Sequence, residues 1–185
     1  PMLDIARLDS PKLIFDVATI MSEELLACGV NLNLAPVCDI WNNDQNKVIW
    51  DRAFGTHHEA VSKFISSMIR GFETSGLLSC AKHFPGHGNT IKDSHYDLPI
   101  VKKPLEQMRA EEFQPFIKAV KARVDFIMMA HIIVEEIDPN LPCSLSPIAH
   151  EILRNELKYK GLILSDDMQM KAITDHRGTG EAAMM

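Results

Sequence analysis

The sequence predicts an α/β fold built on a parallel sheet, and three observations support this prediction. Four short apolar runs recur along the 185 residues, and each has the length of a buried strand. Stretches with a 3.6-residue apolar period lie between the runs and predict amphipathic helices. Polar side chains follow the runs. Strands that alternate with helices in this way form βαβ units, whose strands are parallel.

The predicted strands are residues 30–37, 77–81, 124–130 and 161–164. Each connection between them is long enough to hold a helix that returns the chain to the same end of the sheet. No low-complexity linker and no second zone of composition divides the chain. We therefore expect residues 1–185 to form a single domain.

Two helices are predicted by apolar residues that share one helical face. These residues are Leu13, Val17, Ile20, Met21 and Leu25 in the first helix, and Val61, Phe64, Ile65, Met68 and Phe72 in the second. Ser10 and Ser146 each precede a proline. This pair typically starts a helix, because the hydroxyl accepts a hydrogen bond from a free N–H and the proline needs no partner. Pro115 should divide the third helical region into two pieces.

The composition excludes several classes of protein. Hydrophobic residues make up 46% and charged residues 24%, which is enough apolar material for a sizeable core, so the chain is not intrinsically disordered. The formal net charge is −6 and no run is rich in Lys or Arg. We therefore expect neither nucleic acid nor an anionic membrane surface as a partner, because both require clustered positive charge.

The four cysteines, Cys28, Cys38, Cys80 and Cys143, are scattered and form no CxxC pair. We expect them to be reduced core residues. No apolar run approaches the roughly 20 residues of a membrane span, and no export signal opens the sequence. These features favour a cytoplasmic protein.

Polar residues cluster where the predicted strands end. They are Asp39 after the first strand, Lys82 and His83 after the second, His131 after the third, and Asp166 and Asp167 after the fourth. The carboxyl ends of parallel strands carry the chemistry both in (β/α)8 barrels and in doubly wound sheets. The pattern therefore predicts a site but leaves these two folds open.

The densest polar segment is residues 82–99. Its glycines and prolines permit a tight loop that folds back over a ligand. His87 has a glycine on each side, so we expect it to pin the loop rather than to bind a ligand. Asp93 and His95 can project to the same side of an extended loop, where the carboxylate would orient an imidazole that acts as acid and base. A surface contact without function is the alternative for this pair.

Charged residues near two other strand ends complete the candidates. Asp166 lies nearer the strand end than Asp167, so it is the better candidate for a carboxylate in the site, and Asp167 is expected to cap the following helix. Arg52 lies in the loop after the first strand, where its guanidinium could bind substrate hydroxyls or a carboxylate. A salt bridge to Asp51 or to a neighbouring loop is the alternative for Arg52.

A metal-dependent barrel hydrolase is a competing interpretation, with His83, His87, His95 and Asp166 as ligands. The spacing contains neither an HxH nor an HExxH motif. Lys82 next to His83 would also repel a cation. We therefore expect no metal and no other cofactor.

Five segments together resemble one known family. They are GVNLNLAPVCD (29–39), DRAFG (51–55), KHFPGHGNTIKDSHYDLP (82–99), MMAHI (128–132) and GLILSDDMQMKAI (161–173). In this order they resemble the catalytic barrel of glycoside hydrolase family 3, in its bacterial β-N-acetylglucosaminidase branch. The resemblance runs from about residue 10 to the end and implies a (β/α)8 barrel of the TIM type.

The resemblance also implies a retaining hydrolase that removes terminal, non-reducing β-linked N-acetylglucosamine, as in the recycling of cell-wall muropeptides. By motif, the nucleophile maps onto Asp166, and the acid/base dyad maps onto His95 and Asp93. A retaining mechanism needs an anion that attacks the anomeric carbon and a proton donor at the leaving oxygen. Because a neutral imidazole does not repel an anionic acceptor, transfer to phosphate stays open beside hydrolysis.

The sugar-binding positions implied by the resemblance are Arg52, Lys82 and His83, with His131 nearby at the rim. These side chains would hold the ring hydroxyls and the N-acetyl group and so position the reacting carbon. We therefore expect a small carbohydrate as the partner of this chain.

A complete barrel of this type takes about 250 residues. We therefore expect this chain to be an incomplete, central portion of the barrel with four to five parallel strands. Its open edges would favour self-association. Two alternatives remain, namely a catalytically silent sugar-binding remnant of such an enzyme and the metal-dependent hydrolase.

Overall fold

The computed structural model describes residues 1–90 and 98–185. Its main sheet has four strands in the order β1-β2-β4-β6, namely β1 (Leu32–Asn33), β2 (Leu78–Phe84), β4 (Phe126–Met129) and β6 (Leu162–Ser165). Every neighbouring pair in this sheet is parallel. The predicted parallel α/β architecture is therefore confirmed.

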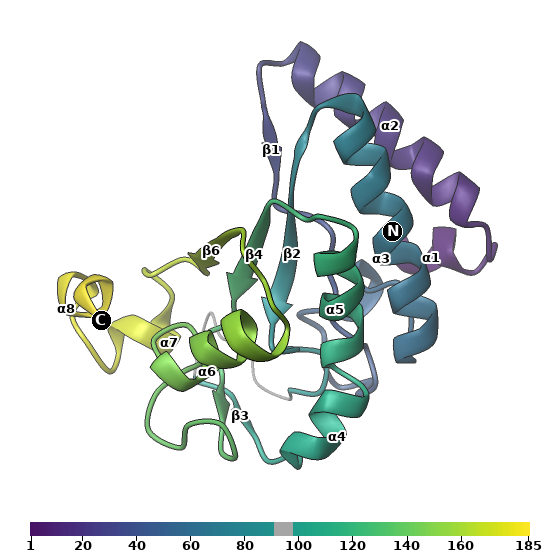
Figure 1. The fold of residues 1–185 in the computed structure, drawn as a ribbon. Helices are drawn as coiled ribbons and strands as arrows, with labels where there is room; N and C mark the ends of the chain where they lie inside the picture. The colour runs from purple at the N-terminus through teal and green to yellow at the C-terminus, as the bar shows by residue number, and fades with distance from the viewer. Residues whose placement is uncertain (91–97) are drawn as a thin grey trace.

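A second, two-stranded sheet lies in the connections that leave the main sheet. It pairs β3 (Ile100–Val101) in parallel with β5 (Ile133–Val134). β3 follows β2 along the chain, and β5 follows β4. Figure 1 shows β3 below the carboxyl ends of the main strands, so the second sheet lies on the side where chemistry is expected.

The first strand is shorter than the predicted residues 30–37. β1 covers two residues, and the chain pairs again with the sheet at a bridge between Val37 and Lys82. Pro36 lies between them and has no N–H, which interrupts the ladder. The carbonyl of Pro36 still accepts a hydrogen bond from the Lys82 N–H at 3.1 Å. The segment therefore stays beside β2 and delivers Asp39 to the end of that strand.

Helices cover one face of the main sheet. α2 (Pro11–Ala27), α3 (His58–Ser75) and α5 (Phe113–Lys121) lie side by side there (Figure 1). The remaining helices are α1 (Met2–Ala6), η1 (Trp50–Arg52), α4 (Leu105–Ala110), α6 (Pro147–Glu151), the π-helix η2 (Ile152–Glu156), α7 (Lys171–Thr174) and α8 (Thr179–Met184). This one-sided cover gives the layered arrangement that βαβ units produce.

The predicted helix boundaries are confirmed at three points. The Ser10 hydroxyl accepts a hydrogen bond from the Leu13 N–H at 3.2 Å, and the Ser146 hydroxyl accepts one from the Ala149 N–H at 3.3 Å. The third helical region is divided into α4 and α5, and Pro115 lies in the first turn of α5. A proline is tolerated there because the N–H groups of a first turn have no partner within the helix.

Aromatic side chains fix the end of β2. Phe84, the last residue of this strand, is buried, with its ring centroid 5.4 Å from that of Phe113 and 5.2 Å from that of Phe116. Both partners belong to α5. This packing sets where the loop of residues 85–90 begins.

The cysteine prediction is correct for three residues of four. Cys38, Cys80 and Cys143 are buried and free, whereas Cys28 is free but exposed. The core prediction is wrong for Cys28 because this residue follows the last turn of α2, at the surface.

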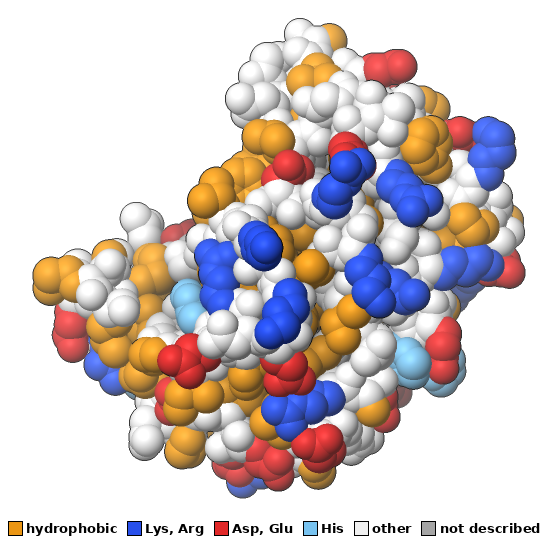
Figure 2. All heavy atoms as spheres, viewed as in Figure 1, with side chains coloured by type: hydrophobic (Ala, Val, Ile, Leu, Met, Phe, Trp, Pro, Cys, Tyr) orange, Lys and Arg blue, Asp and Glu red, His pale blue; other side chains and the backbone are white. Residues whose placement is uncertain are grey.

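The surface carries mixed charge and some apolar side chains. Figure 2 shows Lys and Arg side chains over the middle of the viewed face and acidic side chains toward its lower edge. Leu34, beside β1, is 43% exposed, and Leu162, in β6, is 61% exposed. Apolar side chains are thus exposed to solvent near both edges of the sheet. Within residues 1–90 and 98–185, no helix combines the length and the apolar character of a membrane span.

Candidate functional site

Three strands of the main sheet end side by side. Phe84 in β2 is opposite Met129 in β4, and Met129 is opposite Ser165 in β6. The residues that follow these positions leave the sheet at the same edge. Lys82 and His83, which were expected to follow a strand ending at residue 81, lie within the last residues of the longer β2, and Asp166 follows β6 directly, so the structure gathers them at one rim.

The carboxylate of Asp39 anchors this rim and is fully buried. Its Oδ2 accepts a hydrogen bond from Nδ1 of His83 at 2.7 Å. Its Oδ1 accepts hydrogen bonds from the backbone N–H of His83 at 3.3 Å and of His87 at 2.7 Å. Burial alone would raise the pKa of Asp39, but the charge and hydrogen bond of His83 outweigh it and hold this pKa below its usual value. One carboxylate thus orients the His83 ring and binds two backbone N–H groups, one at the end of β2 and one in the loop that follows it.

The His87 side chain lies inside the protein, 2% exposed, and its contacts agree with the expected pinning role. Its Nδ1 lies 2.7 Å from the Thr90 hydroxyl, and its carbonyl accepts a hydrogen bond from the Asn46 amide at 2.8 Å. Burial, and then the charge of His83, lower the pKa of His87. A buried ring with a lowered pKa favours the neutral form.

Glycines let this loop pass close to its neighbours. Gly86 has φ +131°, and a Cβ there would press on the side chain of Glu112, which pairs with the buried Lys103 at 2.7 Å. A Cβ on Gly88 would overlap the backbone carbonyl of Ile40. The loop therefore needs glycine at both positions.

Lys82 and Arg52 line one cavity of about 390 Å³, whose other walls are largely apolar. The Arg52 guanidinium donates to the carbonyl of Val48 at 2.9 Å, rather than forming the salt bridge to Asp51 that was the alternative. Burial, and then the charge of Arg52, lower the pKa of Lys82, while the negative charge of Asp166 opposes the shift. Two cations beside an apolar wall suit a polar ligand with a hydrophobic face.

The side chain of Asp166 is partly exposed at the end of β6. Its backbone N–H donates to the Met129 carbonyl at 3.1 Å, and its Oδ1 accepts a hydrogen bond from the Asp167 N–H at 2.8 Å. The negative charge of this carboxylate raises the pKa of both Lys82 and His131, against the lowering that burial causes. The structure thus brings the predicted carboxylate to the same rim as the predicted sugar-binding lysine.

The neighbouring Asp167 does not cap a helix, so that expectation is wrong. Its Oδ1 accepts a hydrogen bond from the Gln169 N–H at 2.9 Å. α7 begins only at Lys171, and its N-cap residue, Met170, makes no side-chain cap. Asp167 therefore closes the turn that precedes α7.

His131, which was expected nearby at the rim as a sugar-binding residue, is enclosed by the protein. It has 0% exposure. Its Nδ1 lies 2.7 Å from the Ser144 hydroxyl, and its Nε2 lies 3.0 Å from the Asp167 carbonyl oxygen. Both ring nitrogens are thus occupied by the protein, which argues against direct contact with a sugar.

The predicted dyad of Asp93 and His95 lies outside the residues that the structure describes. The same holds for one ligand of the alternative metal site, His95. Among the residues described on either side of this segment, no group of three or more His, Cys, Asp or Glu side chains could hold a metal ion.

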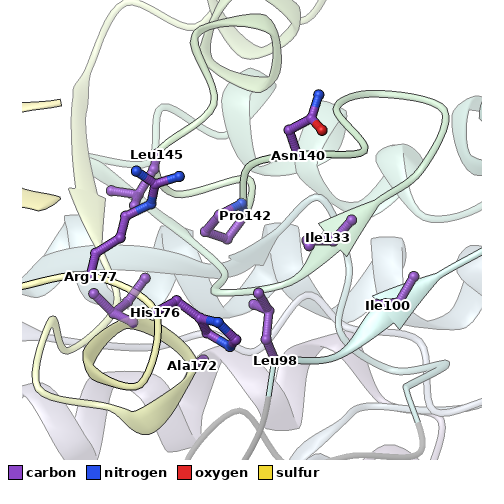
Figure 3. Close-up of a pocket in the computed structure, with 10 residues that line it drawn as sticks. Leu98, Ile100, Ile133, Asn140, Pro142, Leu145, Ala172, His176 and Arg177 are labelled. Carbon is purple, nitrogen blue, oxygen red and sulfur yellow. The ribbon is translucent and has the colours of Figure 1, made fainter.

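A second cavity, of about 530 Å³, lies beside the small β3-β5 sheet (Figure 3). Its wall is mainly apolar and includes Leu98, Ile133 and Leu145. Figure 3 shows Arg177 beside Leu145 and His176 beside Leu98, both away from Ile133; these two residues follow α7. None of the sequence-predicted site residues lines it.

Two residues that organise the rim were not singled out from the sequence. The Asn46 side chain donates to His87 and accepts a hydrogen bond from the Ile49 N–H at 2.9 Å, so it ties the loop after β1 to the loop after β2. The polar run of residues 42–46 is a signal that could have indicated such a role. Ser144 binds the His131 ring, and no local pattern marks it.

Known proteins match most of this chain. The family model described as the glycosyl hydrolase family 3 N terminal domain matches residues 1–185. A beta-hexosaminidase of Idiomarina loihiensis is 40% identical over 160 residues, which are 86% of this chain and 47% of that protein. One from Xylella fastidiosa strain M12 is 35% identical over 91% of this chain and 49% of its own length. The chain thus spans about half the length of the curated relatives it matches.

Solved structures show the same fold. A family 3 beta-N-acetylglucosaminidase from Paenibacillus sp. str. FPU-7 superposes with a TM-score of 0.96 at 38% identity, over 98% of this chain and 35% of that one. NagZ from Neisseria gonorrhoeae, solved with N-trifluoroacetyl-D-glucosamine, superposes with a TM-score of 0.84 at 33% identity, over 94% of this chain and 49% of that one. These likenesses confirm a TIM-barrel-type α/β fold.

Proposed function

This chain belongs to glycosyl hydrolase family 3, and we propose that it supplies the catalytic rim of a retaining β-N-acetylhexosaminidase. Residues 1–185 would form one domain, a part of the family's N-terminal barrel. The relatives named beta-hexosaminidase support the activity, and a terminal β-linked N-acetylglucosamine is the proposed substrate. The recycling of cell-wall muropeptides is the process in which we expect this reaction.

The observation that carries the proposal is the convergence of Asp166 and Lys82 at one rim. The carboxylate acts electrostatically on the lysine, which lines a cavity together with Arg52. A retaining glycosidase needs an anion beneath the anomeric carbon and polar groups around the sugar ring. Lys82, Arg52 and His83 would bind the hydroxyls and the N-acetyl group.

The first chemical step would form a covalent glycosyl-enzyme. A carboxylate oxygen of Asp166 attacks C1 of the sugar as the bond from C1 to the leaving oxygen breaks. His95, oriented by Asp93, would donate a proton to that oxygen. In the second step His95 removes a proton from water, and the water oxygen displaces Asp166 from C1. Two inversions at C1 retain the β configuration.

The contacts of His83 support a role in binding rather than in proton transfer. Its Nδ1 donates to Asp39 at 2.7 Å, which leaves Nε2 as the ring nitrogen available to a ligand. The ring is 8% exposed and its orientation is fixed by a buried carboxylate. A fixed polar group adds binding energy without the entropy cost of ordering a mobile side chain.

The proposal is tested by the release of 4-nitrophenol from 4-nitrophenyl N-acetyl-β-glucosaminide. The test uses the whole protein that the gene encodes. Asp166→Ala and His95→Ala are each expected to abolish turnover, whereas Asp175→Asn, at an exposed acid after α7, retains the wild-type rate. Wild-type rates in either of the first two variants would show that the roles are misassigned.

Two further measurements separate the alternatives. NMR during early turnover follows the product anomer, and an initial α-sugar would contradict retention. Residues 1–185 by themselves are assayed beside the whole protein. Turnover by the whole protein alone would support the view that this chain by itself is a catalytically silent sugar-binding portion.

A further inference from the structure

The ring of His131 lies at the centre of a short hydrogen-bonded chain. This residue follows β4, and its side chain has no exposed surface. One ring nitrogen, Nδ1, lies 2.7 Å from the Ser144 hydroxyl. The other, Nε2, lies 3.0 Å from the backbone carbonyl oxygen of Asp167.

The partners of the ring determine where its proton lies. A carbonyl oxygen only accepts hydrogen bonds, so Nε2 must carry the hydrogen that it donates to Asp167. In the neutral ring Nδ1 is then an acceptor, and the Ser144 hydroxyl donates to it. Burial lowers the pKa of His131, which favours this neutral ring.

The hydrogen-bonded chain continues to the rim carboxylate. The Asp167 N–H donates to Oδ1 of Asp166 at 2.8 Å, and the Asp166 N–H donates to the Met129 carbonyl at 3.1 Å. Asp167 is thus held at its carbonyl by His131 while its N–H contacts the carboxylate. Met129, the last residue of β4, and His131, two residues later, therefore hold the segment that carries Asp166 at two points.

We propose that His131 is a positioning residue for Asp166: its Nε2–H fixes the backbone of Asp167, and that backbone aims the carboxylate at the substrate. This inference rests on the proposed function, in which Asp166 is the nucleophile. It replaces the sugar-binding role that the sequence suggested for His131. A nucleophile must lie about 3 Å from the atom it attacks, so small displacements of its backbone are costly to the rate.

Two amide variants test the assignment atom by atom. The side-chain nitrogen of His131→Gln reaches the place of Nε2 and can still donate to Asp167. The side-chain nitrogen of His131→Asn reaches only the place of Nδ1, on the Ser144 side. Both variants are neutral and polar, so a difference between them reports the bond to Asp167.

The expected result is a loss of kcat in one variant and its rescue in the other. His131→Asn should lower kcat about 100-fold, as small misplacements of reacting groups do. Its KM should stay close to that of the wild type, because no contact with the sugar is lost. His131→Gln should stay within about tenfold of the wild-type kcat, because it loses only the neutral hydrogen bond from Ser144.

Three outcomes would overturn the assignment. Equal kcat losses in both variants, with equal drops in melting temperature, would indicate a purely structural role. A raised KM with an unchanged kcat would indicate sugar binding. An Nδ1–H tautomer for His131, seen in the ¹⁵N NMR spectrum of the wild type, would contradict the geometry directly. A wild type that turns over no glycoside would instead overturn the proposed function. The NMR measurement would still test the tautomer of the His131 ring.

Discussion

Asp39 and His83 form a buried hydrogen-bonded pair, with Oδ2 of the carboxylate and Nδ1 of the ring 2.7 Å apart. Asp39 follows β1 along the chain, whereas His83 lies in β2. The same carboxylate also accepts the backbone N–H of His87. The stability of the rim and the orientation of a proposed sugar-binding ring thus depend on one side chain.

Asp39→Ala is expected to lower the free energy of unfolding by about 3–5 kcal/mol, because it leaves a buried partner and two backbone N–H groups without their acceptor. Urea unfolding followed by circular dichroism measures the change. Asp39→Asn is the matched control, since it keeps an acceptor oxygen and should lose less. A loss below about 1 kcal/mol in Asp39→Ala would show that the pair contributes little.

Acid should remove the contribution of the Asp39 carboxylate to the free energy of unfolding. Its pKa is lowered from 3.8 in the folded protein, so the unfolded chain takes up this proton first. The stability that the carboxylate contributes is therefore fully present above the unfolded pKa and is lost as the pH falls through the folded one. The difference in unfolding free energy between the wild type and Asp39→Asn should be constant near neutral pH and shrink below 3.8. A difference that grows on acidification would contradict this sign.

Gly88→Ala should destabilise the loop, because the added Cβ would overlap the Ile40 carbonyl. Overpacking against a backbone atom costs about 1–3 kcal/mol or more. Gly180→Ala, in α8 with no atom within 4 Å of the added Cβ, is the control and should be neutral or slightly stabilising. Equal melting temperatures in the two variants would be inconsistent with the close approach of Gly88.

Lys82→Ala is expected to raise KM for the N-acetyl-β-glucosaminide about tenfold or more, because it removes a charged hydrogen-bond donor from the site. The effect on kcat should be smaller than on KM. Lys118→Ala, at an exposed lysine in α5, serves as the control and should match the wild type. An unchanged KM would show that Lys82 does not bind the sugar.

The open edges of the sheet should favour self-association. Leu162 is 61% exposed in an edge strand, which is a surface that another strand or chain can cover. Light scattering of residues 1–185 should therefore detect species larger than a monomer, and Leu162→Lys should shift the population toward monomer. A wild-type chain that stays monomeric across concentrations would refute this.

The apolar pattern by itself determined the order of the four main-sheet strands and of the two long helices α2 and α3, but it did not indicate the small β3-β5 sheet. Buried strands need continuous apolar runs, and helices against a sheet need an apolar face. Both patterns can therefore be recognised within a short stretch of the sequence. The starts of α2 and α6 were also readable, because Ser10 and Ser146 act on N–H groups only three residues away. The positions of Lys82, His83 and Asp166 near strand ends follow from the same local logic.

Only the tertiary structure decided what these side chains contact. Asp39, in the segment after β1, contacts His83 in β2 and His87 in the loop after β2, and His131 contacts Ser144 and the turn after β6. A histidine after a strand can face the substrate or support the loop that carries the nucleophile, and the sequence pattern is the same in both cases. Burial and the direction of each hydrogen bond depend on segments far apart along the chain, so they exist only once the sheet has brought those segments together.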